Sequence, residues 1–433
     1  MAIQSLLVIL AVLLVLLFLG VPISYSIAIS SLTAILSTID LNVAVLTAAQ
    51  RTFVGMSKFS LTAIPFFILA GNIMNQGGIA KRLVDFVMAI LGKLPGALLI
   101  TNIGTNALFG AISGSASAAA AAVGSMIRDG AEEQGYDPAV TAATNASSSC
   151  SGLLIPPSNA LITYSLASGG TSVAALFMAG YIPGIIWALA CAVVGVILAK
   201  KLGYKGTPGK FDWKNLGVCT LRALPSLTLI IVVIGGIVGG VFSATEGSAI
   251  AVVYALVLAF CYRSIDLKGL WKIIVDSAKM SGMVVFLVGV SNILGWVMAF
   301  LQIPDAVAAA LLSLTSNKYI ILLIMNVILL VSGTFMDVTP AILIFTPLFL
   351  PICQSFGIST IQFGMILVYN LCIGNITPPV GNALFVGVKV GRTSLEKIMP
   401  YMLMYYVAII SGLLLVTYIP TVSMFLPQLT GLA

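Results

Sequence analysis

The sequence has no histidine and little charge. Asp, Glu, Lys and Arg make up 8% of its 433 residues, whereas soluble globular proteins carry about a quarter, and apolar residues make up 60%. The six cysteines are scattered without a CxxC pair, so neither a zinc site nor a disulfide framework finds support. This composition predicts a protein that lies in a membrane.

Ten apolar segments are long enough to be membrane spans, since about 20 helical residues cross the hydrocarbon core. The first resembles the apolar part of a signal peptide. It lacks a basic stretch before it and runs into a second apolar segment, so we interpret it as a membrane helix. The predicted spans are 5–21, 23–39, 60–76, 139–165, 176–199, 227–243, 245–262, 281–301, 361–388 and 399–420.

The two halves of the sequence repeat each other. Residues 135, 152, 156 and 157 are Gly, Gly, Pro and Pro, and the same residues recur 222 positions later as Gly357, Gly374, Pro378 and Pro379. A Ser/Gly break at 112–115 has an echo at 331–334. We divide the chain into repeats 1–222 and 223–433. The first would hold scaffold helices within 1–76, a hairpin at 96–130, a broken helix at 139–165 and a helix at 176–199; the second, scaffold helices within 227–301, a hairpin at 318–352, a broken helix at 361–388 and a helix at 399–420.

Charge placement predicts that the two halves point in opposite directions. Residues 389–397 carry three basic side chains, whereas the corresponding residues 167–175 carry none. Lys and Arg concentrate in short cytoplasmic loops. If both hairpins are re-entrant, seventeen of the twenty basic residues lie in the cytoplasm and both termini in the periplasm of a bacterial inner-membrane protein. The three outside are Arg51, Lys58 and Lys318.

Four polar segments interrupt the apolar sequence. Two are hairpin tips, at 113–117 and 332–340, and two are breaks before or around Pro-Pro pairs, at 152–159 and 374–382. Inverted repeats with broken helices are typical of secondary transporters, whose sites lie at the breaks. The alternative is that these Gly and Ser residues only allow close helix packing. Matched breaks in both halves favour transport.

The breaks offer oxygen ligands for a sodium ion. Each Pro-Pro pair frees backbone carbonyls in the preceding turn, beside Ser and Thr hydroxyls. Asp337 is the titratable residue of these four segments, and an ionisable group at membrane depth is a functional candidate. Its alternative role is an exposed helix cap. Glu246 has the spacing of a capping box with Ser243 and is interpreted as structural.

An anionic substrate would have to be held without a basic side chain, because none lies in the four segments. We expect the helix that begins near Ser115 to offer its free N–H groups and partial positive charge to a carboxylate. Asn159 and Asn382 follow the two Pro-Pro pairs and could hydrogen-bond polar substrate groups. Their alternative role is to cap the resumed helices.

Four further motifs are distinctive in combination. They are Ile64-Pro65-Phe66-Phe67-Ile68-Leu69-Ala70-Gly71, Ala107-Leu108-Phe109-Gly110-Ala111-Ile112-Ser113-Gly114-Ser115, Ile155-Pro156-Pro157-Ser158 and Thr377-Pro378-Pro379-Val380-Gly381. Together they resemble the large membrane (M) subunit of tripartite ATP-independent periplasmic (TRAP) transporters, and the likeness spans nearly the whole chain.

The resemblance implies an all-α polytopic membrane protein of the elevator type, with an inverted repeat, two re-entrant hairpins and two Pro-Pro-broken helices. It implies a sodium-driven importer that works with a periplasmic binding protein and a small four-helix membrane subunit, both separate chains. Sodium would be the coupling ion, with no organic cofactor.

The resemblance also implies site residues. One sodium site would use Ser113, Ser115, Gly152 and Pro156, and a second Gly333, Asp337, Thr339, Gly374 and Thr377. The substrate would meet Ser115, Ser117, Asn159 and Asn382. Because many family members have apolar residues at the two Asn positions, and because 155–165 looks similar to sialic-acid members, we expect an acidic sugar such as sialic acid.

Two other functions fit parts of the sequence. A self-sufficient carboxylate transporter or cation exchanger could use the same architecture, and dependence on partners would separate it from the TRAP interpretation. An intramembrane serine protease is suggested by residues 111–114, but the sequence has no histidine to activate Ser113. We therefore expect a transporter and not an enzyme.

Overall fold

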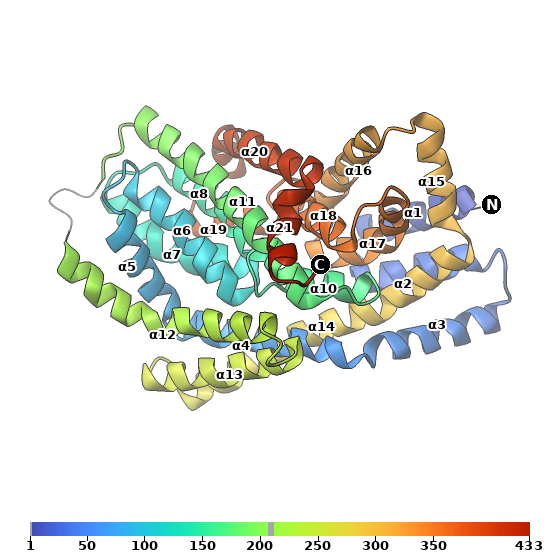
Figure 1. The fold of residues 1–433 in the computed structure, drawn as a ribbon, viewed down its shortest axis with the longest axis horizontal. Helices are drawn as coiled ribbons and strands as arrows, with labels where there is room; N and C mark the ends of the chain where they lie inside the picture. Colours follow the sequence, from blue (N-terminus) through green and yellow to red (C-terminus); the bar gives the residue numbers. More distant parts are fainter. Residues whose placement is uncertain (1, 207–211) are drawn as a thin grey trace.

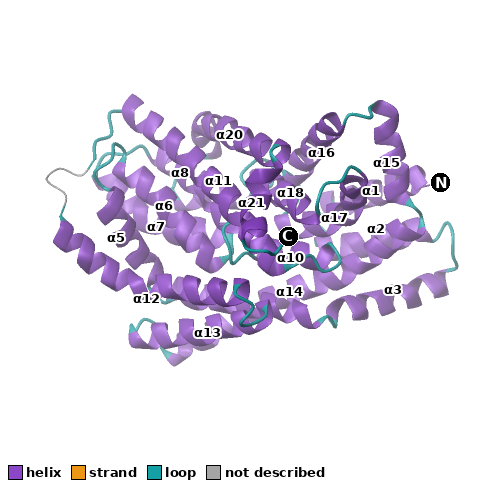
Figure 2. Cartoon of the chain, in the orientation of Figure 1, coloured by secondary structure: helices purple, strands orange, loops and turns teal. Residues whose placement is uncertain are grey.

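The computed structural model describes residues 2–206 and 212–433, and every regular element in them is a helix (Figure 1, Figure 2). Six described helices are long and apolar enough to cross a membrane, and a seventh candidate is a helix pair, 41–56 and 59–76, bent by 61°. The six are α11 Val173–Lys201, α12 Trp213–Val238, α13 Ala244–Cys261, α14 Leu267–Phe300, α17 Val338–Ser355 and α20 Leu395–Tyr418.

Each of the two segments predicted as a hairpin contains two helices joined by a short non-helical stretch. In the first, α6 (Ala97–Ser113) packs against α7 (Ala116–Glu133), and the chain reverses at Gly114, whose φ of +61° suits a residue without a side chain. In the second, α16 (Lys318–Gly333) is followed by α17 after four non-helical residues. Each tip lies at a predicted polar segment.

Both predicted broken helices are present too. The first consists of α8 (Pro138–Ser149), the single turn α9 (Ser151–Leu154) and α10 (Asn159–Ala167), and the second of α18 (Thr360–Gly374) and α19 (Asn382–Val390). The first break was predicted to start at residue 152, but Gly152 is helical and the irregular segment begins at Ile155. Both Pro-Pro bonds are cis.

The long helices at the bottom of Figure 1 form a layer beneath the hairpins and broken helices. They are α3 (Leu41–Met56), α4 (Ala63–Gln76) after the 3-10 turn η1 (Phe59–Thr62), α12, α13 and α14. Both α12 and α14 begin 14 residues before the spans predicted at 227 and 281. Their first turns carry basic residues such as Lys214 and Lys268, which an apolar criterion passes over.

The helices α1 (Ala2–Phe18) and α2 (Ile23–Ile35) correspond to the predicted spans 5–21 and 23–39, whereas four other helices correspond to no predicted span or hairpin. The missed helices are short or carry charge, so they lack the signature of a span. They are α3, α5 (Ile79–Leu91), α15 (Ile303–Leu314) and α21 (Pro420–Leu429).

Several helices of the second half begin 222 residues after helices of the first half. Adding 222 to the bounds of α7, 116–133, gives 338–355, which are the bounds of α17, and α8 and α11 likewise start 222 residues before α18 and α20. Cys150 and Cys372, also 222 residues apart, touch each other: the Cys372 Sγ lies 3.9 Å from the Cys150 carbonyl oxygen. The two broken helices therefore meet at equivalent positions.

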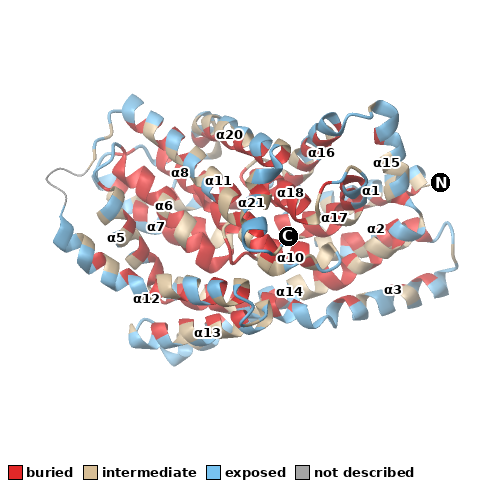
Figure 3. Cartoon of the chain, viewed as in Figure 1, coloured by how far each residue is buried: buried red, intermediate tan, exposed pale blue. Residues whose placement is uncertain are grey.

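Burial is greatest in α6, α8, α17 and α18, and α12, α13 and α14 of the lower layer are more exposed (Figure 3). In α18 every residue from Ile361 to Gly374 is buried, whereas α13 buries seven of its 18 residues. A helix buried on all sides belongs to the interior of the molecule. The helices α6, α8, α17 and α18 of the hairpins and broken helices thus form most of the core, and the lower layer is more exposed to the surroundings.

Candidate functional site

Both hairpin tips and both helix breaks contribute to one cavity of about 170 Å³, which we call the tip cavity. Its opposite wall comes from the lower layer, through Ile64 and Ile68 of α4 and Met280 and Val284 of α14. Six of the predicted site residues line it: Ser115, Ser117, Asn159, Asp337, Thr339 and Asn382.

Four helices begin at the tip cavity. The first residues of α7, α10, α17 and α19 all line it, and these residues are Ala116, Asn159, Val338 and Asn382. A helix N-terminus carries free N–H groups and a partial positive charge. No Lys or Arg is among the residues that line this cavity. Its positive potential therefore comes from backbone dipoles.

The first tip is ordered by serine side chains. The Ser115 Oγ accepts a hydrogen bond from the Ala118 N–H at 3.4 Å and lies 3.2 Å from the Ser117 Oγ. Ser113 is buried, donates to the Ser115 carbonyl at 3.4 Å and does not line the cavity. Ser115 therefore starts α7 as its N-cap, as the sequence predicted.

Asn159 joins the first break to the first tip. Its Nδ2 donates to the Gly114 carbonyl at 3.4 Å, and its buried Oδ1 has no hydrogen-bond partner. The cap of α10 is Ser158, whose Oγ accepts from the Leu161 N–H. Asn159 is therefore not a helix cap, which removes the alternative role considered for it. A buried acceptor without a partner suits a ligand that donates hydrogen bonds.

The second tip presents a free carboxylate. Asp337 precedes α17, but its side chain makes no capping hydrogen bond and no ion pair within the described residues. The Val380 N–H donates to the Thr334 carbonyl at 3.1 Å and so holds the second break to this tip. Asp337 is exposed and lines the cavity.

Asn375 is a lining residue that the sequence interpretation passed over. It is buried, and its carbonyl oxygen accepts from the Ala383 N–H at 3.1 Å, across the second break. Its place directly after Gly374, inside the predicted irregular segment, was the available signal. The scaffold wall of α4 and α14 gave no such signal, because its residues are ordinary apolar ones.

The sequence matches, over residues 10–422, the family described as "Tripartite ATP-independent periplasmic transporter, DctM component". The chain belongs to this family. It is therefore a TRAP large permease, an integral membrane subunit of a transporter and not an enzyme. Large permeases of this family work with a small membrane subunit and a periplasmic binding protein.

This TRAP permease is similar in sequence to proteins that are named for different substrates or for none. It is 49% identical to "Uncharacterized protein YgiK" of Salmonella typhimurium, over 96% of this chain and 95% of that protein. It is 37% identical to the "Isethionate TRAP transporter permease protein DctMQ" of Oleidesulfovibrio alaskensis, over 94% of this chain but 64% of that longer protein. It is 33% identical to the "Sialic acid TRAP transporter large permease protein SiaM" of Vibrio cholerae, over 96% of each.

The fold resembles that of a solved transporter structure. The crystal structure of the Alcanivorax borkumensis YdaH transporter superposes with a TM-score of 0.61 at 16% identity, over 88% of this chain and 89% of that one. At this identity the likeness concerns the fold alone.

Glycines let the tips and breaks of the permease touch. A Cβ on Gly152 would overlap the Cα of Gly110, and a Cβ on Gly374 would overlap the backbone of Gly333. The predicted ligands that do not line the tip cavity are Ser113, Gly152, Pro156, Gly333, Gly374 and Thr377. The side chain of Thr377 donates to the Ile373 carbonyl at 2.7 Å. The three glycines among them lie where backbones meet.

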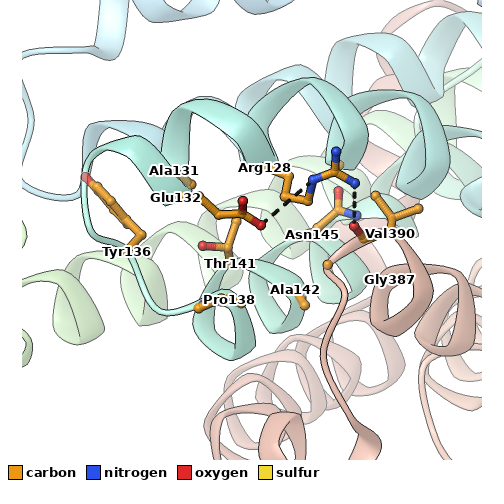
Figure 4. Close-up of a pocket in the computed structure, with 12 residues that line it drawn as sticks. Arg128, Ala131, Glu132, Tyr136, Pro138, Thr141, Ala142, Asn145, Gly387 and Val390 are labelled. Carbon is orange, nitrogen blue, oxygen red and sulfur yellow. Dashed lines mark hydrogen bonds and ion pairs between the residues drawn. The ribbon is translucent and has the colours of Figure 1, made fainter.

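Arg128 connects the first hairpin to the second broken helix (Figure 4). Its Nη1 donates to the Val390 carbonyl at 3.2 Å, at the C-terminus of α19, and its Nη2 pairs with Asp129 at 2.7 Å. A cation is favourable at a helix C-terminus. This contact holds the far end of the helix whose first residue, Asn382, lines the tip cavity.

Glu246 has the structural role predicted for it. Its carboxylate accepts from the Ser243 N–H at 2.7 Å, and the Glu246 N–H donates to the Ser243 Oγ at 3.3 Å. This is a complete capping box at the start of α13.

Proposed function

We propose that this TRAP permease is the translocating subunit of a sodium-coupled importer of a small organic anion in the bacterial inner membrane. The tip cavity is the observation that carries the proposal. Four helix N-termini surround it, with a free carboxylate and no basic side chain. Helix N-termini suit the anion, and oxygen-rich breaks suit the cation, as at other transporter sites.

Sodium would bind where tips and breaks meet. We assign one site to Ser113, Ser115, Gly152 and Pro156, and the other to Gly333, Asp337, Thr339, Gly374 and Thr377. The close backbone approach of each tip to its break supports this pairing. A carbonyl ligand can come from either neighbour of an assigned residue. Asp337 would supply the formal negative charge that attracts the cation.

The repeats would have inverted topology, with both termini in the periplasm. The recurrence of helix bounds and the contact between Cys150 and Cys372 support a two-fold relation of residues 1–222 and 223–433. The division between a buried core and an exposed lower layer supports an elevator in which the core slides along α4 and α14. Their wall of Ile64, Ile68, Met280 and Val284 is apolar, so it offers no specific contact that would resist sliding.

The substrate would be an acidic, hydroxylated molecule of the sialic-acid type. Asn159 has a free acceptor, and Ser115, Ser117 and Asn382 add hydroxyl and amide groups. One negative charge suits a site that has helix ends instead of basic residues. The cavity is below the roughly 300 Å³ of common ligand pockets, so a sugar acid requires the tips or the scaffold wall to move.

Competition uptake tests the substrate. The permease, its small subunit and its binding protein would be reconstituted in liposomes with a sodium gradient and labelled N-acetylneuraminate. We expect unlabelled N-acetylneuraminate to compete and succinate not to. If succinate, isethionate or a branched keto acid is the transported species instead, the sugar assignment is wrong. If uptake of every anion is independent of sodium, the coupling proposal is wrong.

A further inference from the structure

A second cavity, of about 420 Å³, lies where α3 and α14 face the end of α10 and the middle of α17, and we call it the outer cavity. Its volume is in the range of small-molecule sites. Three helices, α10, α14 and α17, contribute residues to both cavities. On α14, Val284 lines the tip cavity and Val288, one turn further, lines the outer cavity.

The same succession occurs on α17 and α10. On α17, Thr339 lines the tip cavity and Leu343 the outer cavity, and on α10, Thr163 lines the tip cavity and Leu166 the outer cavity. At 1.5 Å per helical residue, the cavities are separated by roughly 6 Å along α17 and roughly 5 Å along α10. The outer cavity is therefore the neighbour of the tip cavity on a short path.

Two cations line the outer cavity. Arg51 lies on α3 one turn before Gly55, which packs directly on Asn292, and Lys58 follows the end of α3. Both side chains are exposed, and within the described residues neither forms an ion pair or a hydrogen bond. No Asp or Glu lines this cavity. Two unpaired positive charges therefore face a hollow of ligand size.

The charges of Arg51 and Lys58 are also unusual for their side of the membrane. In the proposed topology they are two of the three basic residues in the periplasm, where Lys and Arg are disfavoured near membrane spans. Gly169, in the loop after α10, lines the same cavity and lies on the same side. The outer cavity would thus open toward the periplasm.

We propose that the outer cavity is a second binding site for the organic anion, occupied before the anion reaches the tip cavity. The proposal rests on the import function proposed above. Arg51 can hold a carboxylate or sulfonate through two parallel hydrogen bonds, and Lys58 adds a point charge. Asn292 and Trp296 give the uncharged part of the ligand an amide and an aromatic face.

The two sites differ in what attracts the anion. At the tip cavity the positive potential comes from helix ends and bound sodium, whereas at the outer cavity it comes from side chains. Binding at the outer cavity is therefore independent of sodium. A phospholipid phosphate has similar chemistry, but the walls of α10 and α17 belong to the core, which favours a soluble anion.

Saturation-transfer NMR tests the proposal without sodium. The permease in phosphatidylcholine nanodiscs, in choline buffer, would be titrated with N-acetylneuraminate, isethionate and succinate. We expect saturable binding of at least one of them, weakened about tenfold or more by Arg51→Gln and by Lys58→Gln, since a charged hydrogen bond contributes about 1.5–3 kcal/mol. Lys58→Arg should keep most of the binding.

Lys318→Gln is the matched control, because Lys318 is the third periplasmic basic residue and does not line the cavity. It should bind as the unchanged protein does. The proposal is overturned if no anion binds without sodium or if neither Gln variant weakens binding. It is also overturned if phosphatidylglycerol in the nanodiscs displaces the anions, which would assign the cavity to lipid. None of these results would contradict the proposed sodium-driven uptake. If the transporter instead shows no sodium-driven uptake, anion binding at the outer cavity can still be measured.

Discussion

Asp337 is the acidic residue among those that line the tip cavity, and within the described residues its carboxylate takes part in no helix cap and no ion pair. We expect Asp337→Ala to raise the sodium concentration for half-maximal uptake about tenfold or more, because the change removes the formal negative charge that attracts the cation. The measurement is uptake by the complete transporter in liposomes at increasing sodium concentrations.

Asp305→Ala is the control for this change. Asp305 is also an exposed acid at the start of a helix, in the first turn of α15, but it does not line the tip cavity. Its removal should leave the sodium dependence unchanged. An unaltered sodium dependence in Asp337→Ala would show that Asp337 is not a ligand.

Asn159 should affect the substrate more than the sodium ion. Its free Oδ1 is proposed to accept a hydrogen bond from the substrate, and one such bond in a buried site is worth about 1–3 kcal/mol. We expect Asn159→Ala to raise KM about tenfold while the half-saturating sodium concentration stays the same. Asn215→Ala, an exposed asparagine of α12, serves as the control. Equal changes in both quantities would indicate a structural role.

Residues of the site could be found from sequence where polar groups interrupt apolar helices. Asp337, Ser115 and Asn159 were predicted in this way, and all three line the tip cavity. Gly152 and Gly374 belong to the same irregular segments, but they lie where two backbones touch. A sequence shows that a glycine is present and does not show which helix approaches it. The apolar scaffold wall carries no chemical signal either.

At the scale of elements, close packing of tip and break depends on glycine. We expect Gly152→Ala to lower the midpoint of thermal unfolding in detergent, because its methyl group would overlap Gly110 and overpacking costs about 1–3 kcal/mol. Gly130→Ala is the control, since nothing lies within 4 Å of the added carbon and Ala favours a helix by about 1 kcal/mol. A thermally normal Gly152→Ala protein would mean that the helices separate easily.

Elements with an interrupted apolar pattern were predicted well, and charged or amphipathic ones were not. The Ser/Gly and Pro-Pro segments mark both tips and both breaks, because helices cannot continue through them. The helix α5 carries Lys81, Arg82 and Asp85 and is stabilised by packing on α6 and α12, a contact that only the folded chain provides. The N-terminal extensions of α12 and α14 also carry charged residues, and this is why the apolar pattern did not predict them.

The orientation of the elements can be tested by labelling. In a background with the exposed Cys261 replaced by Ser, single cysteines at Lys205 and Arg392 should react only from the cytoplasm, and one at Ser172 only from the periplasm. The reason is that positions 172 and 394 are repeat partners that inverted topology places on opposite sides. Labelling of positions 172 and 392 from the same side would remove the inverted repeat.

At the scale of the whole molecule, the permease combines a buried core with a lower layer whose outer face is apolar and exposed. Val253 and Val257 of α13 and Leu221 of α12 are among the exposed apolar side chains. Such a surface suits lipid or a membrane partner and not water. The family pairs its large permeases with a small membrane subunit and a binding protein, and the isethionate relative is a longer protein than this chain.

We therefore expect the purified chain alone not to import its substrate. In the proposed importer a binding protein would capture the anion and deliver it, so the permease itself would need only a weak site from which the anion can leave. The tip cavity has no basic side chain, which agrees with weak binding. Uptake by liposomes that contain the chain alone should stay at background under a sodium gradient, and adding the small subunit and the loaded binding protein should restore it. Sodium-driven uptake without either partner would instead favour a self-sufficient carboxylate transporter.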